Sequence, residues 1–117
     1  RVEINTRTAT ILLAPAGVFT GCMDGLYWYR GALVGIQNSI HPGRVMHFAL
    51  SSGGDRIVHA TVLERYHPAF NGVTTAAIDG ESLLYFANTQ SRAFQADGTP
   101  RPGVALAPIQ ILRLPLP

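Results

Sequence analysis

Few residues of the chain have types and positions suited to chemistry, and one carboxylate stands out among them. Asp24 lies between Met23 and Gly25, directly before a short aromatic run. A carboxylate placed at the start of such a run can act as a proton acceptor or as a ligand of a hard cation. Asp and Gly also form turns that have no further role. The position of Asp24 alone leaves both interpretations open.

Three other kinds of site lack the patterns that they need. No G-x-S-x-G elbow surrounds a serine, as a serine hydrolase of that type requires. Gly53-Gly54 joins two expected strands instead of leading into a helix, as a phosphate-binding loop does. The spacing of the histidines matches no zinc signature; they are His41, His47, His59 and His67.

The elements that must position these residues are β-strands. Twelve glycines and eight prolines interrupt the chain every few residues, which leaves little room for a helix. Short alternating, β-branched or aromatic runs separated by turn residues predict an all-β fold. Residues 51–55 and Asp79-Gly80 are expected to form hairpin turns. The expected strands are residues 1–6, 9–13, 25–29, 32–36, 44–50, 56–63, 74–78, 82–87 and 109–114.

An internal repeat relates two parts of the chain at an offset of fifty residues. Residues 24–38 align without a gap with residues 74–88, each a short apolar strand, a glycine-containing turn, a second apolar strand and an Asn. Residues 1–6 also resemble residues 44–49, since both begin with Arg-Val and alternate. A repeat of four strands and forty to fifty residues is the size of a β-propeller blade.

The repeat also adds candidate site residues. Thr74 aligns with Asp24, so its hydroxyl is expected to point toward the same central axis, where it either contacts a substrate or merely begins a strand. Asn38 and Asn88 occupy equal places at the ends of the second strands. Each either faces a ligand or bonds the backbone of a turn, as Asn commonly does. Both interpretations stay open for all three residues.

The strand order divides the chain into parts of three blades. Residues 1–20 are expected to be two outer strands of one blade, residues 21–67 a complete blade, and residues 68–117 three strands of a further blade. Propellers have four to eight blades. Uncovered sheet faces and edges invite association. We therefore expect a segment of a longer propeller, or a chain that assembles with further copies of itself.

The runs GCMDGLYWYRGALVGIQN, HPGRVMHFAL, VLERYHPAFNGVTTAAIDGESLLYFANTQ and ILRLPL resemble the senescence marker protein/gluconolactonase (regucalcin-like) family. The resemblance is to a bacterial branch with unassigned substrates. It covers nearly the whole chain but only the C-terminal part of the family, about its last two blades. It implies a six-bladed propeller with one divalent metal, often calcium, in the central channel. It further implies hydrolysis of a lactone or ester.

The resemblance gives Asp24 a role. Asp24 occupies the position of an Asp that binds the metal and is the favoured general base in the family, with Met23 in place of the usual Pro. A metal lowers the pKa of a bound water, and a nearby carboxylate can take its proton. The family's other ligands, a Glu and an Asn, have no counterpart here. Because calcium takes six to eight oxygens, the chain alone cannot complete that site. The alternative is a non-catalytic propeller segment that serves binding or assembly.

Composition and charge limit the class of protein and the kinds of partner that we expect. The chain is 47% hydrophobic and 14% charged, which excludes intrinsic disorder, and no apolar stretch is long enough to predict a transmembrane helix. The net charge is +2, and all nine basic residues are Arg spread along the sequence. A phosphate-binding face needs clustered cations, so we expect no nucleic-acid partner.

The sequence also predicts which way three aromatic residues and the single cysteine face. Tyr27 and Tyr29 should point to one side of a strand and Trp28 to the other, because side chains alternate. Packing between neighbouring blades is the expected role, and stacking on a sugar is the alternative. Cys22 has no partner for an internal disulfide and lies among apolar neighbours, so we expect it to be buried.

Overall fold

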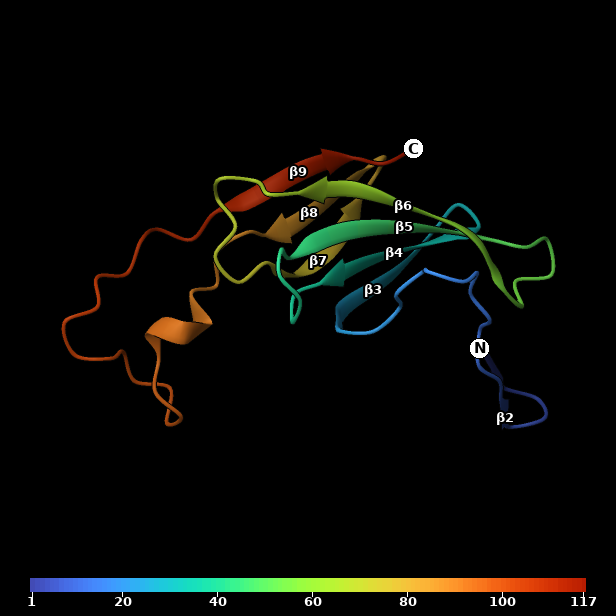
Figure 1. The fold of residues 1–117 in the computed structure, drawn as a ribbon, viewed down its shortest axis with the longest axis horizontal. Coiled ribbons are helices and arrows are strands. Elements are labelled where there is room, and N and C mark those ends of the chain that lie inside the picture. Colours follow the sequence, from blue (N-terminus) through green and yellow to red (C-terminus); the bar gives the residue numbers. More distant parts are fainter.

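Alternating strands and tight turns fold the chain into three antiparallel sheets, described for all 117 residues by a computed structural model (Figure 1). The first sheet pairs β1 (Val2–Glu3) with β2 (Thr8–Ala9). The second has the order β3 (Met23–Tyr29), β4 (Ala32–Gln37), β5 (Arg44–Leu50), β6 (Ile57–Arg65). The third has the order β7 (Thr74–Asp79), β8 (Ser82–Phe86), β9 (Ile111–Pro115). A short 3-10 helix, η1, spans Ser91–Ala93. The all-β class is confirmed.

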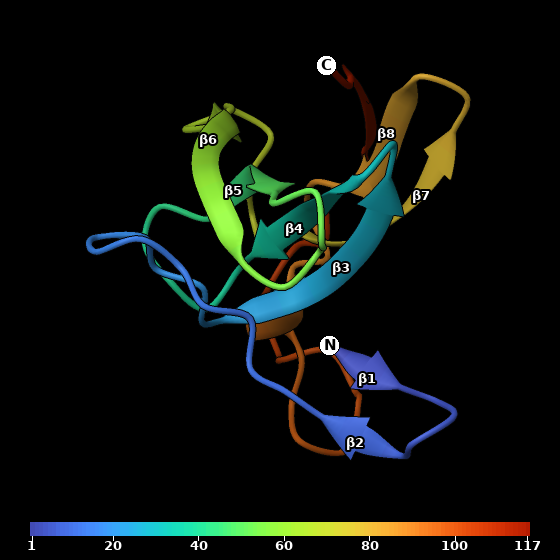
Figure 2. The same ribbon diagram turned by 90° about the vertical axis from the view of Figure 1, so that its right-hand side faces the viewer.

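The N-terminal strands are shorter than expected. Strands were predicted over residues 1–6 and 9–13, but only Val2–Glu3 and Thr8–Ala9 pair. This hairpin lies apart from the two larger sheets (Figure 2). Its apolar side chains stay in solvent, with Ile4 83% exposed. A two-stranded ribbon without a covered face is marginal, which explains why the pairing stops so soon.

The internal repeat is confirmed in the strand register. Tyr29 pairs with Ala32 across one tight turn, and Asp79 pairs with Ser82 across the other, so the two hairpins share one register at an offset of fifty residues as far as their bulges. The first turn has positive φ at both Arg30 and Gly31, as two-residue hairpins of the primed type require. The first strands of the two larger sheets, β3 and β7, also carry a bulge near their start, at Asp24 in β3 and one repeat position later, at Thr75, in β7.

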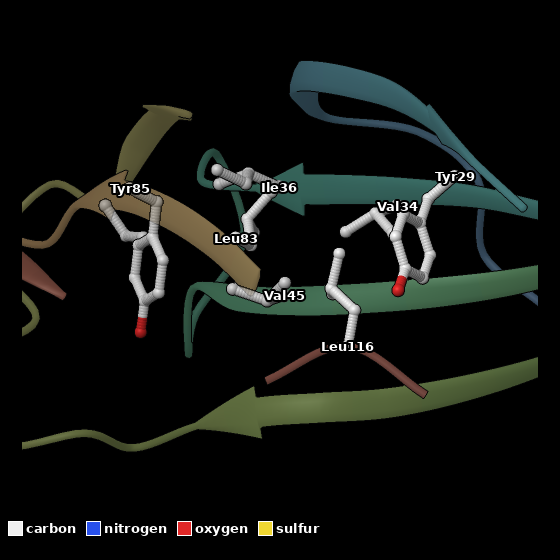
Figure 3. Close-up of a cluster of buried hydrophobic side chains, with 8 residues drawn as sticks. Tyr29, Val34, Ile36, Val45, Leu83, Tyr85 and Leu116 are labelled. Atoms are coloured by element: carbon white, nitrogen blue, oxygen red, sulfur yellow. The ribbon is translucent and has the colours of Figure 1, made fainter. Parts of the chain in front are cut away.

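The main hydrophobic core lies between the four-stranded and the three-stranded sheet. Figure 3 shows its side chains converging from the two layers. Val34 of β4 and its repeat equivalent Leu84 of β8 define the two faces of each sheet. We call the side that carries these residues the front face and the opposite side the back face. The front face of β3–β6 packs on the back face of β7–β9. The buried members of this core are Tyr29, Val34, Ile36, Val45, Val73, Leu83, Tyr85 and Leu116.

The two sheets therefore stack front to back. Leu83 is fully buried in this core, whereas its repeat equivalent Leu33 lies on the back face of β3–β6 and is only partly buried. Equivalent faces thus point in the same direction along the stack. A front-to-back contact is heterologous, and repetition of such a contact makes rings or open arrays.

The outer faces of the stack are incompletely covered. On the back face of β3–β6 a smaller cluster of Met46, Phe48 and Ile57 is partly covered by Val18, but Leu26 is 55% and Trp28 63% exposed. Only 17 of the 117 residues are buried, and the molecule measures 52 × 30 × 28 Å. None of its helical segments has the length and apolar character needed to cross a membrane.

The aromatic prediction is confirmed and the cysteine prediction is wrong. Tyr29 is buried in the main core and Tyr27 packs against it, whereas Trp28 faces the opposite way. Cys22 is exposed. It precedes β3 with a positive φ of 58°, and its carbonyl accepts the Asn38 N–H at 3.2 Å. The backbone of Cys22 is thus fixed to β4, while its side chain is directed away from the core.

Candidate functional site

A polar pocket of about 880 Å³ opens where β3 and β7 begin. Asp24 and Thr74 lie at these strand starts and contribute to its wall. The remaining wall comes from the loops after β4, β6 and β8. Its polar side chains outnumber its apolar ones; they include Asp24, Asn38, Ser39, His41, His67, Asn71, Thr74, Thr89, Ser91 and Arg92.

The structure brings Asp24 and Thr74 into contact. The Thr74 hydroxyl donates a hydrogen bond to Asp24 Oδ2. The strands are held together beside this contact by Tyr27, whose hydroxyl accepts the Ala76 N–H at 2.6 Å and lies 3.3 Å from the Thr75 hydroxyl. The contact therefore rests on an anchored pair of strands. Asp24 itself is exposed to solvent.

The two asparagines of the repeat differ in their surroundings. Asn38 lines the pocket, and its Oδ1 accepts a hydrogen bond from the Ser39 hydroxyl at 3.0 Å. Asn88 is 4% exposed and does not line the pocket. Its Nδ2 donates to the Pro108 carbonyl at 2.8 Å, and its Oδ1 accepts the Gln110 N–H at 2.6 Å. Asp24, Asn38 and Thr74 thus share one pocket, and Asn88 ties the loop before β9 to the end of β8.

The rim contains residues that the sequence did not single out for this site. His41 and His67 both line it, as does Arg92. The His67 Nδ1 accepts the Ala69 N–H at 3.1 Å, so the neutral ring carries its proton on Nε2 and can donate it to a ligand. Arg92 forms no ion pair and adds positive charge to the pocket that Asp24 also lines. Both histidines precede proline, which marks loops but not their convergence.

Buried glutamines hold the loops near the pocket. Gln37 is fully buried; its Nε2 donates to the Phe19 and Gly21 carbonyls at 3.0 and 2.8 Å, and its Oε1 accepts from Arg44 Nε at 2.7 Å. Gln90 bonds the backbone of Ala107 in a similar way, with 2.9 and 2.8 Å contacts. Gln37 is the last residue of the apolar strand β4, and Gln90 directly precedes η1.

A further polar contact joins β6 of one sheet to β8 of the other. The buried Tyr85 hydroxyl donates to a Glu64 carboxylate oxygen. Burial, together with the hydrogen bond and the negative charge of Glu64, raises the pKa of Tyr85 far above its usual range. The neutral tyrosine is therefore the stable form between the sheets at every ordinary pH.

The pocket residues do not make a complete metal site. Asp24 is the only carboxylate among the lining residues. No group of three or more His, Cys, Asp or Glu side chains is close enough to hold a metal ion. Asp24 and the Asn38 amide supply the oxygen type that calcium prefers, but calcium takes six to eight oxygens. This chain on its own does not fit the metal that the sequence resemblance implies.

Comparison of the chain with protein-family models, curated proteins and solved structures found no match. The geometry of the pocket and the internal repeat are therefore the observations that bear on function. Both place Asp24 near the start of β3, where it lines the polar pocket.

Proposed function

We propose that the chain is the C-terminal segment of a gluconolactonase-like, six-bladed β-propeller, and that Asp24 belongs to an active site that hydrolyses lactones or esters. The observation that carries this proposal is the contact between Asp24 and Thr74, which are equivalent in the sequence repeat and lie near the starts of β3 and β7. In a propeller, the blades are arranged around a central channel. A carboxylate at the start of an inner strand would lie at the end of that channel.

The stacking of the sheets supports the propeller part of the proposal. Two repeat-related sheets meet front to back, and both ends of the stack remain open. Repetition of the same contact by further blades would close a ring and cover exposed residues such as Leu26 and Trp28. The remaining blades, from the same protein or from other copies, are the partners of this chain.

The proposed chemistry assigns separate tasks to the residues of the pocket. The Thr74 hydroxyl fixes Asp24 Oδ2, which leaves Oδ1 free to accept a proton from an attacking water. Asn38 at the wall is placed to hydrogen-bond a polar substrate. Asn88, tied to backbone, acts on the substrate only through the loop that it holds. A divalent cation, calcium in the resembling family, would need ligands from other blades.

The test is the hydrolysis of a panel of sugar lactones and simple esters by the assembled protein, with and without added calcium. We expect Asp24→Asn to lower the rate by at least about 100-fold, as loss of a general base does. Asp79→Asn is the matched control, because Asp79 lies at the far end of β7 in an exposed ion pair with Arg113. Full activity in the folded Asp24→Asn variant would refute the hydrolase.

The second candidate is a non-catalytic propeller segment that serves binding or assembly. The lone carboxylate of the pocket and the exposed apolar residues on both outer faces favour it. An assembled protein that hydrolyses no member of the panel, although it associates tightly with further blades, would support this candidate over the hydrolase.

A further inference from the structure

The pocket contains opposite charges that come from different parts of the fold. Its carboxylate, Asp24, lies near the start of β3, whereas its guanidinium group, Arg92, lies in η1 on the loop between β8 and β9. Two imidazoles, His41 and His67, come from the loops after β4 and after β6. The proposed hydrolysis uses the carboxylate and gives the guanidinium group no task.

Arg92 and Arg7 are the arginines whose guanidinium groups have no partner in the chain, and Arg7 lies in the turn between β1 and β2, outside the pocket. The other arginines all have one. A carboxylate pairs with Arg1, Arg30, Arg56 and Arg113, Gln37 accepts from Arg44, the Tyr66 ring lies against Arg65, and the Arg92 carbonyl accepts from Arg101. All N–H donors of the Arg92 side chain are therefore free to bind a ligand.

The segment that carries Arg92 is fixed to the surrounding structure. Directly before η1, the N–H of the buried Gln90 donates to the Asn71 carbonyl at 3.0 Å, and its side chain bonds the backbone of Ala107. Arg101 Nε donates to the Arg92 carbonyl at 3.1 Å. The free guanidinium group thus extends from an anchored backbone, which lowers the entropic cost of holding a ligand.

His67 supplies a second donor to the same pocket. Its Nδ1 accepts the Ala69 N–H at 3.1 Å, and the centre of its ring lies 5.6 Å from that of Phe70. Phe70 in turn packs edge-on against Tyr85 of the main core. These contacts set the orientation of the imidazole and leave its Nε2–H as the group that is free to bind a ligand.

This donor set is suited to a carboxylate. Arg forms paired, charge-assisted hydrogen bonds with the two oxygens of a carboxylate. A single guanidinium group balances one negative charge, and a phosphate dianion would bring a second one into a pocket that already holds Asp24. The amides and hydroxyls in the rest of the wall suit a ligand rich in hydroxyl groups, and the volume of about 880 Å³ is that of a small-molecule site.

We propose that Arg92 and the Nε2–H of His67 bind the carboxylate group of a small sugar acid. If the proposed function holds, on which this step rests, the substrate is a lactone or ester that carries a second, free carboxylate. Water then adds to the lactone carbonyl carbon, the ring C–O bond breaks, and the proton that Asp24 accepts passes to the ring oxygen. The free carboxylate stays unchanged on Arg92, which selects anionic over neutral substrates.

The first experiment measures binding without hydrolysis. The full chain is titrated with D-glucuronate and with D-glucose, which differ only by a carboxylate in place of a hydroxymethyl group, and NMR follows the signals of His67. We expect glucuronate to bind at least about tenfold more tightly, as a charge-assisted bond provides. Arg92→Gln should remove this preference, and Arg7→Gln, the matched control at the other free arginine, should keep it. Both side chains are exposed, so neither change removes a buried contact.

Three results of this titration would overturn the proposal. The first is equal binding of glucuronate and glucose, including no binding of either. The second is a preference for glucuronate that survives Arg92→Gln. The third is displacement of glucuronate by inorganic phosphate at a lower concentration than that of the sugar acid, because the site would then prefer phosphate to a carboxylate.

The second experiment separates this inference from the hydrolase itself. The assembled protein is given the γ-lactones of D-glucarate and D-gluconate, which differ in the same way. We expect kcat/KM to be at least about tenfold higher for the glucarate lactone, and Arg92→Gln to lower that value alone. Equal values for the two lactones would overturn the inference and leave the hydrolase standing. Arg92-dependent binding of glucuronate without hydrolysis of either lactone would refute the hydrolase and support the carboxylate site.

Discussion

The sheets β3–β6 and β7–β9 contain the same hairpin at an offset of fifty residues, yet equivalent residues have different environments. Leu83 is fully buried, whereas Leu33 is only partly covered. Tyr29 belongs to the core, whereas Asp79 is exposed and paired with Arg113. In both sheets the local sequence determines where the strands and the turn form. Whether a given side chain is buried depends on whether another sheet packs against the face on which it lies.

The largest expected effect comes from the pair of equivalent leucines. Leu83→Ala should lower the free energy of unfolding by about 3 kcal/mol, because it opens a cavity between the two sheets. Leu33→Ala should cost only about 1 kcal/mol, because its side chain is partly in solvent. Urea denaturation curves measure the free energy of unfolding of both variants. Equal losses would show that the back face of β3–β6 is covered as well as the core is.

The two asparagines provide the next comparison. Asn88→Ala should cost about 2 kcal/mol, since it leaves the Pro108 carbonyl and the Gln110 N–H without their partner. Asn38→Ala should change the stability by less than about 0.5 kcal/mol, because its side-chain bond to Ser39 is exposed. Thermal unfolding of the two variants shows which one loses more stability, and we expect the lower midpoint for Asn88→Ala. A destabilised Asn38→Ala variant would mean that both asparagines are structural.

The Tyr85–Glu64 contact between the sheets predicts a loss of stability at alkaline pH. An unfolded tyrosine loses its proton near pH 10, but burial and Glu64 hold the pKa of Tyr85 above that value in the folded chain. Stability is therefore retained below about pH 10 and falls above it, by at most about 1.4 kcal/mol per pH unit from this group. Tyr85→Phe should remove this part of the slope in denaturation curves measured at increasing pH. An unchanged slope would contradict the buried contact.

The smallest expected effect concerns His47 of β5 and His59 of β6, two histidines on the front face of their sheet. Burial and, to a lesser extent, the nearby His59 lower the pKa of His47. The stability that depends on neutral His47 is present above about pH 6.5 and is lost as the pH falls below it. His59→Gln should raise the pKa of His47 slightly, as an NMR titration of the ring would show. His67→Gln, in the pocket, is the control and should leave that pKa unchanged.

Much of the fold could be predicted from the sequence, because alternation and turn residues act locally. The strands from β3 onward lie close to their expected bounds, and the repeat fixed the equivalence of the two hairpins. The length of the N-terminal strands could not be predicted in this way, since it depends on whether another strand covers them. The exposure of Cys22 could not be predicted either. Its backbone has a positive φ, which directs the side chain away from its apolar neighbours in the sequence.

The candidate site was predictable only in part. The repeat indicated that Asp24 and Thr74 lie at equivalent strand starts, and the structure places them in contact. His41, His67 and Arg92 come from loops outside the repeat, and their convergence on one pocket depends on how the two sheets stack. The separate surroundings of Asn38 and Asn88 likewise follow from the loop between β8 and β9, which is much longer than the loop between β4 and β5.

The central claim is that this chain is an open stack of repeated sheets that needs further sheets to cover its outer faces. Light scattering of the purified chain, with denaturing mass spectrometry alongside, tests this claim most directly. The account predicts a native mass well above 12.6 kDa, from further copies or from a second polypeptide, and a lower mass for Trp28→Glu. A stable, monodisperse monomer of 12.6 kDa would contradict the account, and the proposed lactonase would then lose its structural basis.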